Sequence, residues 1–546
     1  MPKSSTWIAL RNAAFRRLWI ANLVSGSAIT AHGTAAFWVL DSLGKSDATL
    51  LLSLMATLSS LPFALFTLPA GAIADLVDRK KMLCAVSLWQ AAVATGLAIL
   101  GVTHLLSAYL ILTSAFLFGA GFAFGSPASS AVTAEMVPAE DLPGANNLSA
   151  LQMNIAGIVG PALGGIMIPL IGASCIFALN GVGFLLVLVA IVLWKRRGPQ
   201  SQLPLENFFE SFITAIRYVR YTPGIRIILV RSALFSFFIS IIAALMPAVG
   251  LEELHLEAAN LGFLFTSMAT GSVITSVFII PWARSRYSPQ RLTTYADASL
   301  IVACLLMATI RWSHMFLGVA ALAGVGLTLS STELWVAGQR AMPDWARGRM
   351  NAMIIMVSQG ATALGSLVWG TAAANVGLVS PFLAAAALFI IVMIVTRLPA
   401  YRLSIDFTTD LNLEPAPATL FLNSLARLPD PREGPLSITT KFQVDADRRE
   451  EFLDLATGAR LIYLRNGAYG WHLKEDLAQM NSFQIEVIVP SWTHHLRQRE
   501  RLTKNEMEIV HRLYSLHRGP GPPEEWASLH LDKEVVERAA RSSGPH

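Results

Sequence analysis

The feature that most constrains this sequence is a series of apolar runs, each about as long as a lipid bilayer is thick. A helix needs roughly 20 mostly apolar residues to cross the hydrocarbon core of a bilayer. The runs are separated by short polar loops and end near Arg397. We therefore predict twelve membrane-spanning helices in an all-α fold. Their ranges are 18–40, 48–74, 82–103, 106–128, 149–171, 173–194, 226–250, 258–282, 292–311, 315–339, 350–374 and 377–397.

The composition supports two physical regimes in one chain. Of the 546 residues, 14% are charged, whereas about a quarter are charged in a soluble protein. The deficit lies before Tyr401, and the tail after it has an ordinary mixed composition. The net charge of +5 does not indicate nucleic acid, because the basic residues flank the apolar runs. The lipid bilayer is the predicted partner.

No cofactor or metal is expected. The three cysteines, Cys84, Cys175 and Cys304, lie in apolar runs and have no metal-binding spacing, so we interpret them as packing residues. The sequence also contains no nucleotide-binding P-loop of the form Gly-x4-Gly-Lys-Ser/Thr. Any energy-requiring function must then use a gradient.

Basic residues predict the orientation. Loops after odd-numbered helices hold Lys45 and Arg311 and little other positive charge. The opposite side holds Lys3, Arg11, Arg16, Arg17, Arg79, Lys80, Lys81, Lys195, Arg196, Arg197, Arg217, Arg220, Arg284, Arg286, Arg291, Arg340, Arg347 and Arg349. Because cytoplasmic loops are enriched in Lys and Arg, we place both termini in the cytoplasm, with the helices in a bacterial inner membrane.

An internal repeat relates the two six-helix halves. One offset of 205 residues, as from Arg79 to Arg284, aligns many positions. The other pairs are Gly119 and Gly324, Gly121 and Gly326, Ser126 and Ser331, Pro138 and Pro343, Asn146 and Asn351, Gly160 and Gly365, Gly165 and Gly370, and Gly172 and Gly377. Parallel six-helix repeats are typical of transporters whose halves rock about a central site.

The segment between the second and third helices, residues 71–81, reads GAIADLVDRKK. It resembles the major facilitator superfamily motif of Gly, three residues, Asp-Arg, one residue, and Gly-Arg-Arg/Lys. Leu76 replaces the usual Arg and Asp78 the usual Gly. The resemblance implies a conformational latch for the outward-facing state, with Arg79 bonding across the interface of the halves; a merely basic loop that fixes topology is the alternative. The predicted latch residues are Gly71, Asp75, Asp78, Arg79 and Lys80.

Two further runs narrow the resemblance. Residues 10–19 read LRNAAFRRLW and residues 146–151 read NNLSAL. Together with ADLVDR at 74–79 they resemble the enterobactin-exporter branch, the transmembrane secretion effectors. That resemblance implies transport of a small molecule and covers the membrane region and, in longer members, the tail. It does not identify the cargo.

Polar residues at membrane depth are costly and are therefore functional candidates. His32 lies near the middle of the first helix and has a side chain that titrates near neutrality, so it is the first candidate for proton coupling, with an interhelical hydrogen bond as the alternative. The other coupling candidates, nearer to helix ends, are Asp41, Asp297 and Glu333. The candidates for lining a cavity are Asn22, Gln90, Gln152, Asn154, Asn180 and Gln359.

The tail begins with a Pro-rich linker and continues as a compact α+β pattern. Strands are predicted at 437–444, 468–473, 483–489 and 528–531, and helices at 446–464 and 491–516, the second in two pieces. The order strand-helix-strand-strand-helix-strand predicts a ferredoxin-like sandwich.

Two tail segments carry a second resemblance. Residues 465–471 (RNGAYGW) and 491–503 (SWTHHLRQRERLT) are similar to the tail of long secretion effectors, which looks like the dimeric barrel of antibiotic-biosynthesis monooxygenases. Ligand sensing, self-association and plain structural support remain open, and fold alone does not confer the enzyme activity. The predicted small-molecule site comprises Trp471, Trp492, His494 and His495.

The sequence thus predicts a secondary transporter, not an enzyme. Proton-coupled export of a siderophore or drug-like molecule by a rocker-switch cycle is the leading hypothesis. The alternatives are an importer or lipid flippase on the same scaffold, and a membrane-tethered enzyme or sensor acting through the tail. The predicted domains are the N-terminal half 1–197, the central cytoplasmic loop 198–225, the C-terminal half 226–398, the linker 399–435 and the soluble domain 436–546.

Overall fold

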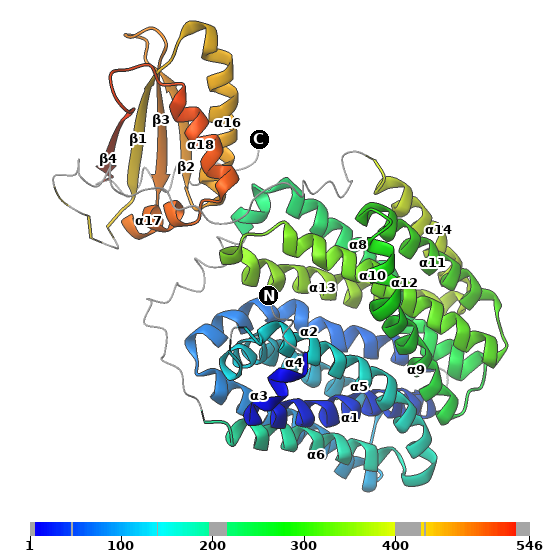
Figure 1. Ribbon diagram of the computed structural model, residues 1–546. Helices are drawn as coiled ribbons and strands as arrows, with labels where there is room; N and C mark the ends of the chain where they lie inside the picture. Colours follow the sequence, from blue (N-terminus) through cyan, green and yellow to red (C-terminus); the bar gives the residue numbers. More distant parts are fainter. Residues whose placement is uncertain are drawn as a thin grey trace. The chain divides into compact units, whose positions relative to one another are not determined.

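The computed structural model describes residues 6–44, 47–138, 140–195, 216–398, 427, 429–430 and 433–530 (Figure 1). By its internal contacts the chain divides into two compact units. The first unit contains Met1–Leu205, Ile227–Ala337 and Asn351–Leu403. The second combines the C-terminal domain with Glu206–Arg226 and Gly338–Met350. The domain boundaries proposed from the sequence stay predictions.

The first unit is helical throughout its described part. The N-terminal half contains η1 (Thr6–Arg11), α1 (Ala13–Gly44), α2 (Ala48–Leu76), α3 (Arg79–Val102), α4 (Ala108–Met136), α5 (Leu142–Ile171) and α6 (Ala173–Val192). The C-terminal half contains α8 (Pro223–Ala248), η3 (Val249–Glu253), α9 (Ala258–Ile274), η4 (Thr275–Ile279), α10 (Ile280–Arg284), α11 (Pro289–Thr309), α12 (Ser313–Arg340), α13 (Asp344–Val376) and α14 (Val379–Val395). The α8 and α13 helices begin in segments assigned to the second unit.

The helical membrane fold predicted from the sequence is confirmed. Within the described residues, 11 helices are long and apolar enough to cross a bilayer, with α9, η4 and α10 forming one span. The predicted twelfth span corresponds to α14, an apolar helix of 17 residues. That length is at the lower limit for a crossing helix, so the count of twelve stays a prediction.

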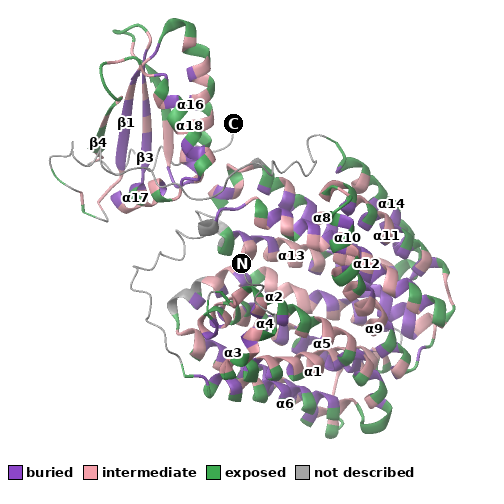
Figure 2. Cartoon of the chain, in the orientation of Figure 1, coloured by how far each residue is buried: buried purple, intermediate pink, exposed green. Residues whose placement is uncertain are grey.

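Lipid is the solvent that suits the outer surfaces of these helices. Val182 and Val189 of α6 and Ile391 and Ile394 of α14 are each more than half exposed. Figure 2 shows exposed positions along both helices. Water would penalise so many exposed β-branched side chains on neighbouring turns. In a bilayer they meet acyl chains instead, and the polar backbone is satisfied inside each helix.

The internal repeat extends from sequence to three-dimensional contacts. Glycines paired by the 205-residue offset lie against equivalent helices in the two halves. These are Gly119 and Gly324, which face α2 and α9; Gly121 and Gly326, which face α3 and α11; Gly160 and Gly365, which face α1 and α8; and Gly165 and Gly370, which face α9 and α2. Gly172 and Gly377 even share a φ of +79°. The contacts of Gly165 and Gly370 exchange the halves, as a pseudo-two-fold axis requires.

The C-terminal domain is an antiparallel sheet covered by helices. Its elements are β1 (Leu436–Gln443), η6 (Ala446–Arg448), α16 (Arg449–Arg465), β2 (Gly470–Glu475), β3 (Ser482–Val489), α17 (Trp492–Glu500), α18 (Lys504–Ser515) and β4 (Glu524–Leu529). The strand order β2-β3-β1-β4 is the ferredoxin-like arrangement that the sequence predicts. The last strand starts four residues earlier than expected, because β4 pairs with β1 from Lys441 opposite Glu524 to Leu436 opposite Leu529.

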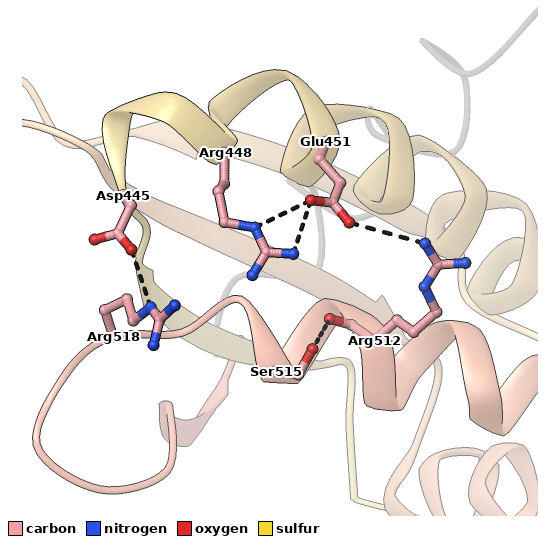
Figure 3. A network of polar contacts seen from close by, with 6 residues as sticks. All are labelled: Asp445, Arg448, Glu451, Arg512, Ser515 and Arg518. Atoms are coloured by element: carbon pink, nitrogen blue, oxygen red, sulfur yellow. Dashed lines mark hydrogen bonds and ion pairs between the residues drawn. The ribbon is translucent and has the colours of Figure 1, made fainter.

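Polar contacts at one end of this domain join α16 to α18 (Figure 3). Glu451 accepts hydrogen bonds from Arg448 at 3.1 and 2.8 Å and lies 3.8 Å from Arg512. Arg518, which follows α18, pairs with Asp445 at 2.9 Å. These side chains are partly or largely exposed, so each pair adds at most about 1 kcal/mol. Most of the stability comes from the apolar core between the sheet and α16.

Candidate functional site

The predicted latch lies where α2 ends and α3 begins. Asp78 is the N-cap of α3, and its carboxylate accepts a hydrogen bond from the backbone nitrogen of Lys81 at 2.9 Å. This satisfies an open N–H group and places negative charge at the positive end of the helix dipole. Among the described residues nothing approaches the Cβ position of Gly71, so its predicted close helix contact is not seen. The side chain of Asp75 lies outside the described residues.

Arg79 and Lys80 connect the start of α3 to the ends of two neighbouring helices. Arg79 Nη1 lies 3.0 Å from a carboxylate oxygen of Glu135 in the last turn of α4. Lys80 Nζ donates to the carbonyl oxygens of Val192 at 2.9 Å and Trp194 at 2.6 Å. These contacts all lie within the N-terminal half. Sequence reasoning missed Glu135, although an acid just before a helix end beside a basic loop is a usable signal.

The C-terminal half contains the counterpart of this ion pair. Arg284, the repeat partner of Arg79, ends α10 and bonds through Nε to Glu333 of α12 at 2.8 Å. Glu333 is 2% exposed. The sequence suggested Glu333 as a proton-coupling residue, and the structure places it in an ion pair at the junction equivalent to the latch.

His32 is packed inside the N-terminal half. Its ring lies 5.1 Å from that of Phe118 on α4 and 4.5 Å from that of Phe177 on α6, measured between centroids. Its Nδ1 is 3.3 Å from the amide nitrogen of Asn180, also on α6. The interhelical hydrogen bond considered as the alternative for His32 is therefore present, and the ring is enclosed by α1, α4 and α6.

Asp297 belongs to a buried polar network in the C-terminal half. Its carboxylate accepts a hydrogen bond from the Ser330 hydroxyl at 3.3 Å, and the positive charge of Arg231 acts on it. Arg231 in turn donates to Gln290 at 2.9 Å and to Thr293 at 3.2 Å. Arg231 and Asp297 are both buried, so this network joins α8, α11 and α12 by charge and hydrogen bonding at membrane depth.

The two halves contact each other where α2 begins and where η3 follows α8. The Thr49 hydroxyl is 2.6 Å from both carboxylate oxygens of Glu252. Phe37 of α1 stacks on Phe265 of α9 with centroids 5.5 Å apart. The partly buried Asp41, one turn beyond Phe37, interacts electrostatically with Glu252. Asp41 thus lies at a contact between the halves and not in the interior of one half.

The uncharged polar candidates separate into two groups. Gln90 and Asn180 are buried between helices of the N-terminal half, so in this structure they pack rather than line a cavity. The half-buried candidates are Asn22, Gln152, Asn154 and Gln359. Their accessibility suits a cavity wall, and their role stays a prediction.

The four tail candidates do not form one site. His495 is buried and lines a cavity between the sheet and the helices. Trp492 stacks on the His495 ring at 5.3 Å, and the ring of His494 bonds to the Ser491 hydroxyl at 2.8 Å. Trp471 packs against the hydrophobic core from β2. The part of the chain that the structure describes contains no group of three or more His, Cys, Asp or Glu residues placed to bind a metal.

Curated relatives of this chain are bacterial efflux proteins. It is 24% identical over 357 residues to macrolide efflux protein A of Streptococcus pyogenes, covering 64% of this chain and 87% of the relative. It is 25% identical over 343 residues to the multidrug efflux pump Tap of Mycolicibacterium fortuitum, covering 61% and 83%. It is 25% identical over 363 residues to the enterobactin exporter EntS of Salmonella choleraesuis, covering 65% and 85%.

Solved structures support the fold. A bacterial homologue of the lysosomal transporter Spinster, in an inward-facing and unoccupied conformation, gives a TM-score of 0.58 at 13% identity. The match covers 72% of this chain and 97% of that chain. The POT family transporter PepTSo also gives a TM-score of 0.58 at 13% identity, over 72% of this chain and 99% of that chain.

The family assignment rests on nearly the whole sequence. The family model described as transmembrane secretion effector matches residues 4–535, which include both the helical halves and the tail. The repeated glycine contacts and the paired Arg79 and Arg284 junctions agree with that assignment. The chain therefore belongs to the transmembrane secretion effectors of the major facilitator superfamily, a family of multi-pass membrane transporters rather than enzymes.

Proposed function

We propose that this protein exports a small organic molecule, siderophore-like or drug-like, in exchange for protons. The names of its relatives support export, because they describe efflux of macrolides, of multiple drugs and of enterobactin. A gradient is the expected energy source, since the sequence contains no P-loop for a nucleotide. The substrate is a partner of the membrane region, and protons are the proposed co-partner.

The separation of the contacts between the halves from the latch junctions supports alternating access. The Thr49 and Glu252 hydrogen bonds and the packing of Gly165 on α9 hold the halves together at the helix ends remote from the latch. The latch junctions of Arg79 and Arg284, by contrast, bond within their own halves. A rocker-switch cycle would break the first set of contacts and bring the second region together.

We place the protein in the bacterial inner membrane with both termini in the cytoplasm. The excess of Lys and Arg in the loops on the N-terminal side supports this orientation. In this orientation the closed ends near Thr49 and Glu252 would face away from the cytoplasm, and we propose that this state loads substrate from inside. Fusions of alkaline phosphatase to the loop after α1 and to the C-terminus test the orientation.

For coupling we propose Asp297 ahead of His32. A coupling group must reach water in one state and change its proton affinity between states. Gln290, the hydrogen-bond partner of Arg231, lines a surface cavity of about 340 Å³ together with Arg397. This gives the Asp297 network a route toward solvent, whereas His32 is enclosed by aromatic rings of its own half.

The decisive experiment is transport into inverted membrane vesicles with a panel of substrates. The panel contains a macrolide, a catecholate siderophore and a cationic dye, each measured with an imposed pH difference and after its collapse. Accumulation that requires the pH difference supports proton-coupled export. Flux in the opposite direction would identify an importer. Movement of labelled lipid alone would identify a flippase. Loss of all activity when the tail is removed would favour a tethered enzyme.

A further inference from the structure

The C-terminal domain contains a cavity that the transport cycle does not use. Its volume is about 580 Å³, within the range of roughly 300–1,000 Å³ typical of small-molecule sites. Ile438 and Phe442 of β1 and Ile485 and Val487 of β3 form its floor. These side chains share one face because residues two apart on a strand point the same way, and Ile438 pairs directly with Val487.

One wall of the cavity is polar. Tyr463 of α16, Tyr514 of α18, His495 and Arg499 of α17, and Glu525 of β4 line it. Burial raises the pKa of Tyr463 to about 12 and raises the pKa of Tyr514 well above its ordinary value, so both phenols stay protonated at neutral pH. Burial, followed by the nearby charge of Arg499, lowers the pKa of His495 to about 4, so the imidazole is neutral. Tyr463, Tyr514 and His495 therefore present neutral hydrogen-bonding groups to the cavity.

The cavity lining also contains charges of both signs, Arg499 and the carboxylates of Glu524 and Glu525. Arg499 is the charged neighbour that acts on the carboxylate of Glu525. Burying the charge of an anionic or cationic ligand against the apolar floor would carry a substantial cost in free energy. An uncharged molecule with an apolar body and hydroxyl or carbonyl groups at one side matches both the apolar floor and the polar wall.

The same helices contact a segment of the central loop. Tyr218, which is buried, lies 5.8 Å by its ring from the guanidinium of Arg465 at the end of α16. Arg465 forms an ion pair with Glu506 in the first turn of α18. Two cavity residues are near neighbours of this pair, Tyr463 two positions before Arg465 and Met507 directly after Glu506. A shift of α16 or α18 on binding would therefore reach Tyr218.

A second contact fixes the loop segment to the domain. The Arg217 guanidinium lies 4.2 Å from the ring centroid of Tyr469, a cation–π distance, and donates to the carbonyl of Gly467 at 3.5 Å. Tyr221 packs against the hydrophobic core of the domain. The segment 216–222 leads directly into α8, the first helix of the C-terminal half.

We propose that the C-terminal domain binds an uncharged, largely apolar organic molecule in this cavity, and that occupancy is transmitted through the Arg465–Glu506 pair to the segment that joins the two membrane halves. Binding at this site would make the exporter responsive to a cytoplasmic metabolite. The proposal does not depend on the direction or coupling of transport, since it concerns the soluble domain.

Hydrogen exchange by mass spectrometry on the full chain in lipid nanodiscs tests both parts of the proposal. The probes are 1-naphthol and the larger estradiol, both neutral, with 1-naphthalenesulfonate as the charged control. We expect a neutral probe to slow exchange several-fold in peptides from β1 and α18 and also in residues 216–222. The sulfonate should bind at least about tenfold more weakly, because burying its charge is costly.

Matched variants identify the site. Val510→Trp fills the cavity from α18, whereas Glu508→Trp adds the same ring to an exposed position of the same helix. The first should abolish probe protection and the second should retain it. Tyr514→Phe keeps the shape, and loss of its hydroxyl should weaken probe affinity about fivefold.

Arg217→Ala separates binding from transmission. We expect it to bind the probe normally in β1 and α18 while residues 216–222 no longer gain protection. The binding proposal is overturned if neither neutral probe protects the domain or if Val510→Trp is protected like the parent. The transmission step is overturned if 216–222 never responds while the domain does. Transport measured in the same preparations reports separately on the export proposal.

Discussion

At the scale of single residues, two of the buried ionisable groups, His32 and Asp297, have different surroundings. His32 contacts Phe118, Phe177 and Asn180 in its own half. Asp297 interacts with Arg231, a charged group of its own half. Proton affinity that differs between states is what couples a proton to a cycle, so the charged neighbour is the more informative feature.

We therefore expect Asp297→Asn to retain substrate binding and to lose accumulation driven by a pH difference. His32→Gln should keep the pH response. It should lower the free energy of unfolding by about 1–3 kcal/mol, because the Gln side chain packs less well than imidazole between the neighbouring aromatic rings. Substrate binding and uptake into inverted vesicles with and without the pH difference provide the measurement. If His32→Gln abolishes the response and Asp297→Asn does not, the histidine is the carrier.

His495 makes the stability of the C-terminal domain depend on pH. Burial and Arg499 lower its pKa to about 4 in the folded state, whereas an exposed histidine titrates near 6.5. Its neutral form therefore contributes full stability above about pH 6.5, and that contribution declines as the pH falls toward 4, by at most about 3 kcal/mol.

The test is global hydrogen exchange of the domain in the full chain at pH 7.0, 6.0 and 5.0. The parent should lose protection between these values, and His495→Gln should lose less because its side chain does not titrate. The control variant is His472→Gln, because His472 is exposed on β2. An unchanged slope in His495→Gln would contradict the assignment.

At the scale of elements, close packing of α5 on α9 holds the two halves together. A Cβ on Gly262 would collide with the backbone of α5, coming 3.0 Å from the Cα of Gly165. A Cβ on Gly157 of the same α5 would meet Ala269 of α9 at an ordinary 3.7 Å. The same interface thus offers one position that forbids a methyl group and one that accepts it.

We expect Gly262→Ala to destabilise the closed end by about 1–3 kcal/mol and to shift the population toward the opposite-facing state. Gly157→Ala should leave the population unchanged. A cysteine at position 49, labelled from outside by a membrane-impermeant maleimide, reports opening of this end. Faster labelling in Gly262→Ala alone is the expected result. Equal labelling rates in both variants would show that the interface accommodates the added methyl group and would contradict the prediction.

We expect the junction of α2 and α3 to control the rate of transport turnover and not the affinity for substrate. Arg79 holds Glu135 at the far end of α4, away from the contacts between the halves. The pair is partly exposed and worth at most about 1 kcal/mol, so Arg79→Ala should fold. Its turnover should fall several-fold with the substrate Kd nearly constant.

Lys81→Ala is the matched control, since Lys81 is exposed in the same turn and contributes its backbone to the Asp78 cap. Transport kinetics and equilibrium binding on the same samples separate the two parameters. An equal loss of affinity and turnover in Arg79→Ala would remove the latch role.

At the scale of the whole molecule, the sequence predicted the helices and their internal repeat. It did not predict which side chains pair between helices. Apolar runs follow from the thickness of a bilayer. The 205-residue offset pairs Gly160 with Gly365, and the structure packs these two glycines on equivalent helices, α1 and α8. The partners Glu135 and Glu333 depend on which faces of separate helices meet. One sequence without its contacts does not contain that information.

The same limit explains the tail. Strand alternation predicted a sheet in which β1 is central, and the sequence picked out His495. Nothing in the sequence separated Trp471 and His494 from His495. In the structure Trp471 packs against the hydrophobic core from β2, and His494 bonds to Ser491 at the N-cap of α17. The Tyr463 and Tyr514 wall was missed, because residues of α16 and α18 become neighbours only when both helices pack on one face of the sheet.

The last prediction tests whether the halves move as rigid bodies. Thr49 belongs to the N-terminal half and Glu252 to the C-terminal half, and their side chains touch at 2.6 Å. A short crosslink between cysteines at 49 and 252, with Cys84, Cys175 and Cys304 replaced by Ser, should trap this end closed and stop transport, which reduction restores. A crosslink between cysteines at 253 and 311, where Glu253 pairs with Arg311 inside one half, should leave transport intact. Inhibition by both crosslinks would mean that the C-terminal half deforms internally, and inhibition by neither would mean that this end need not open.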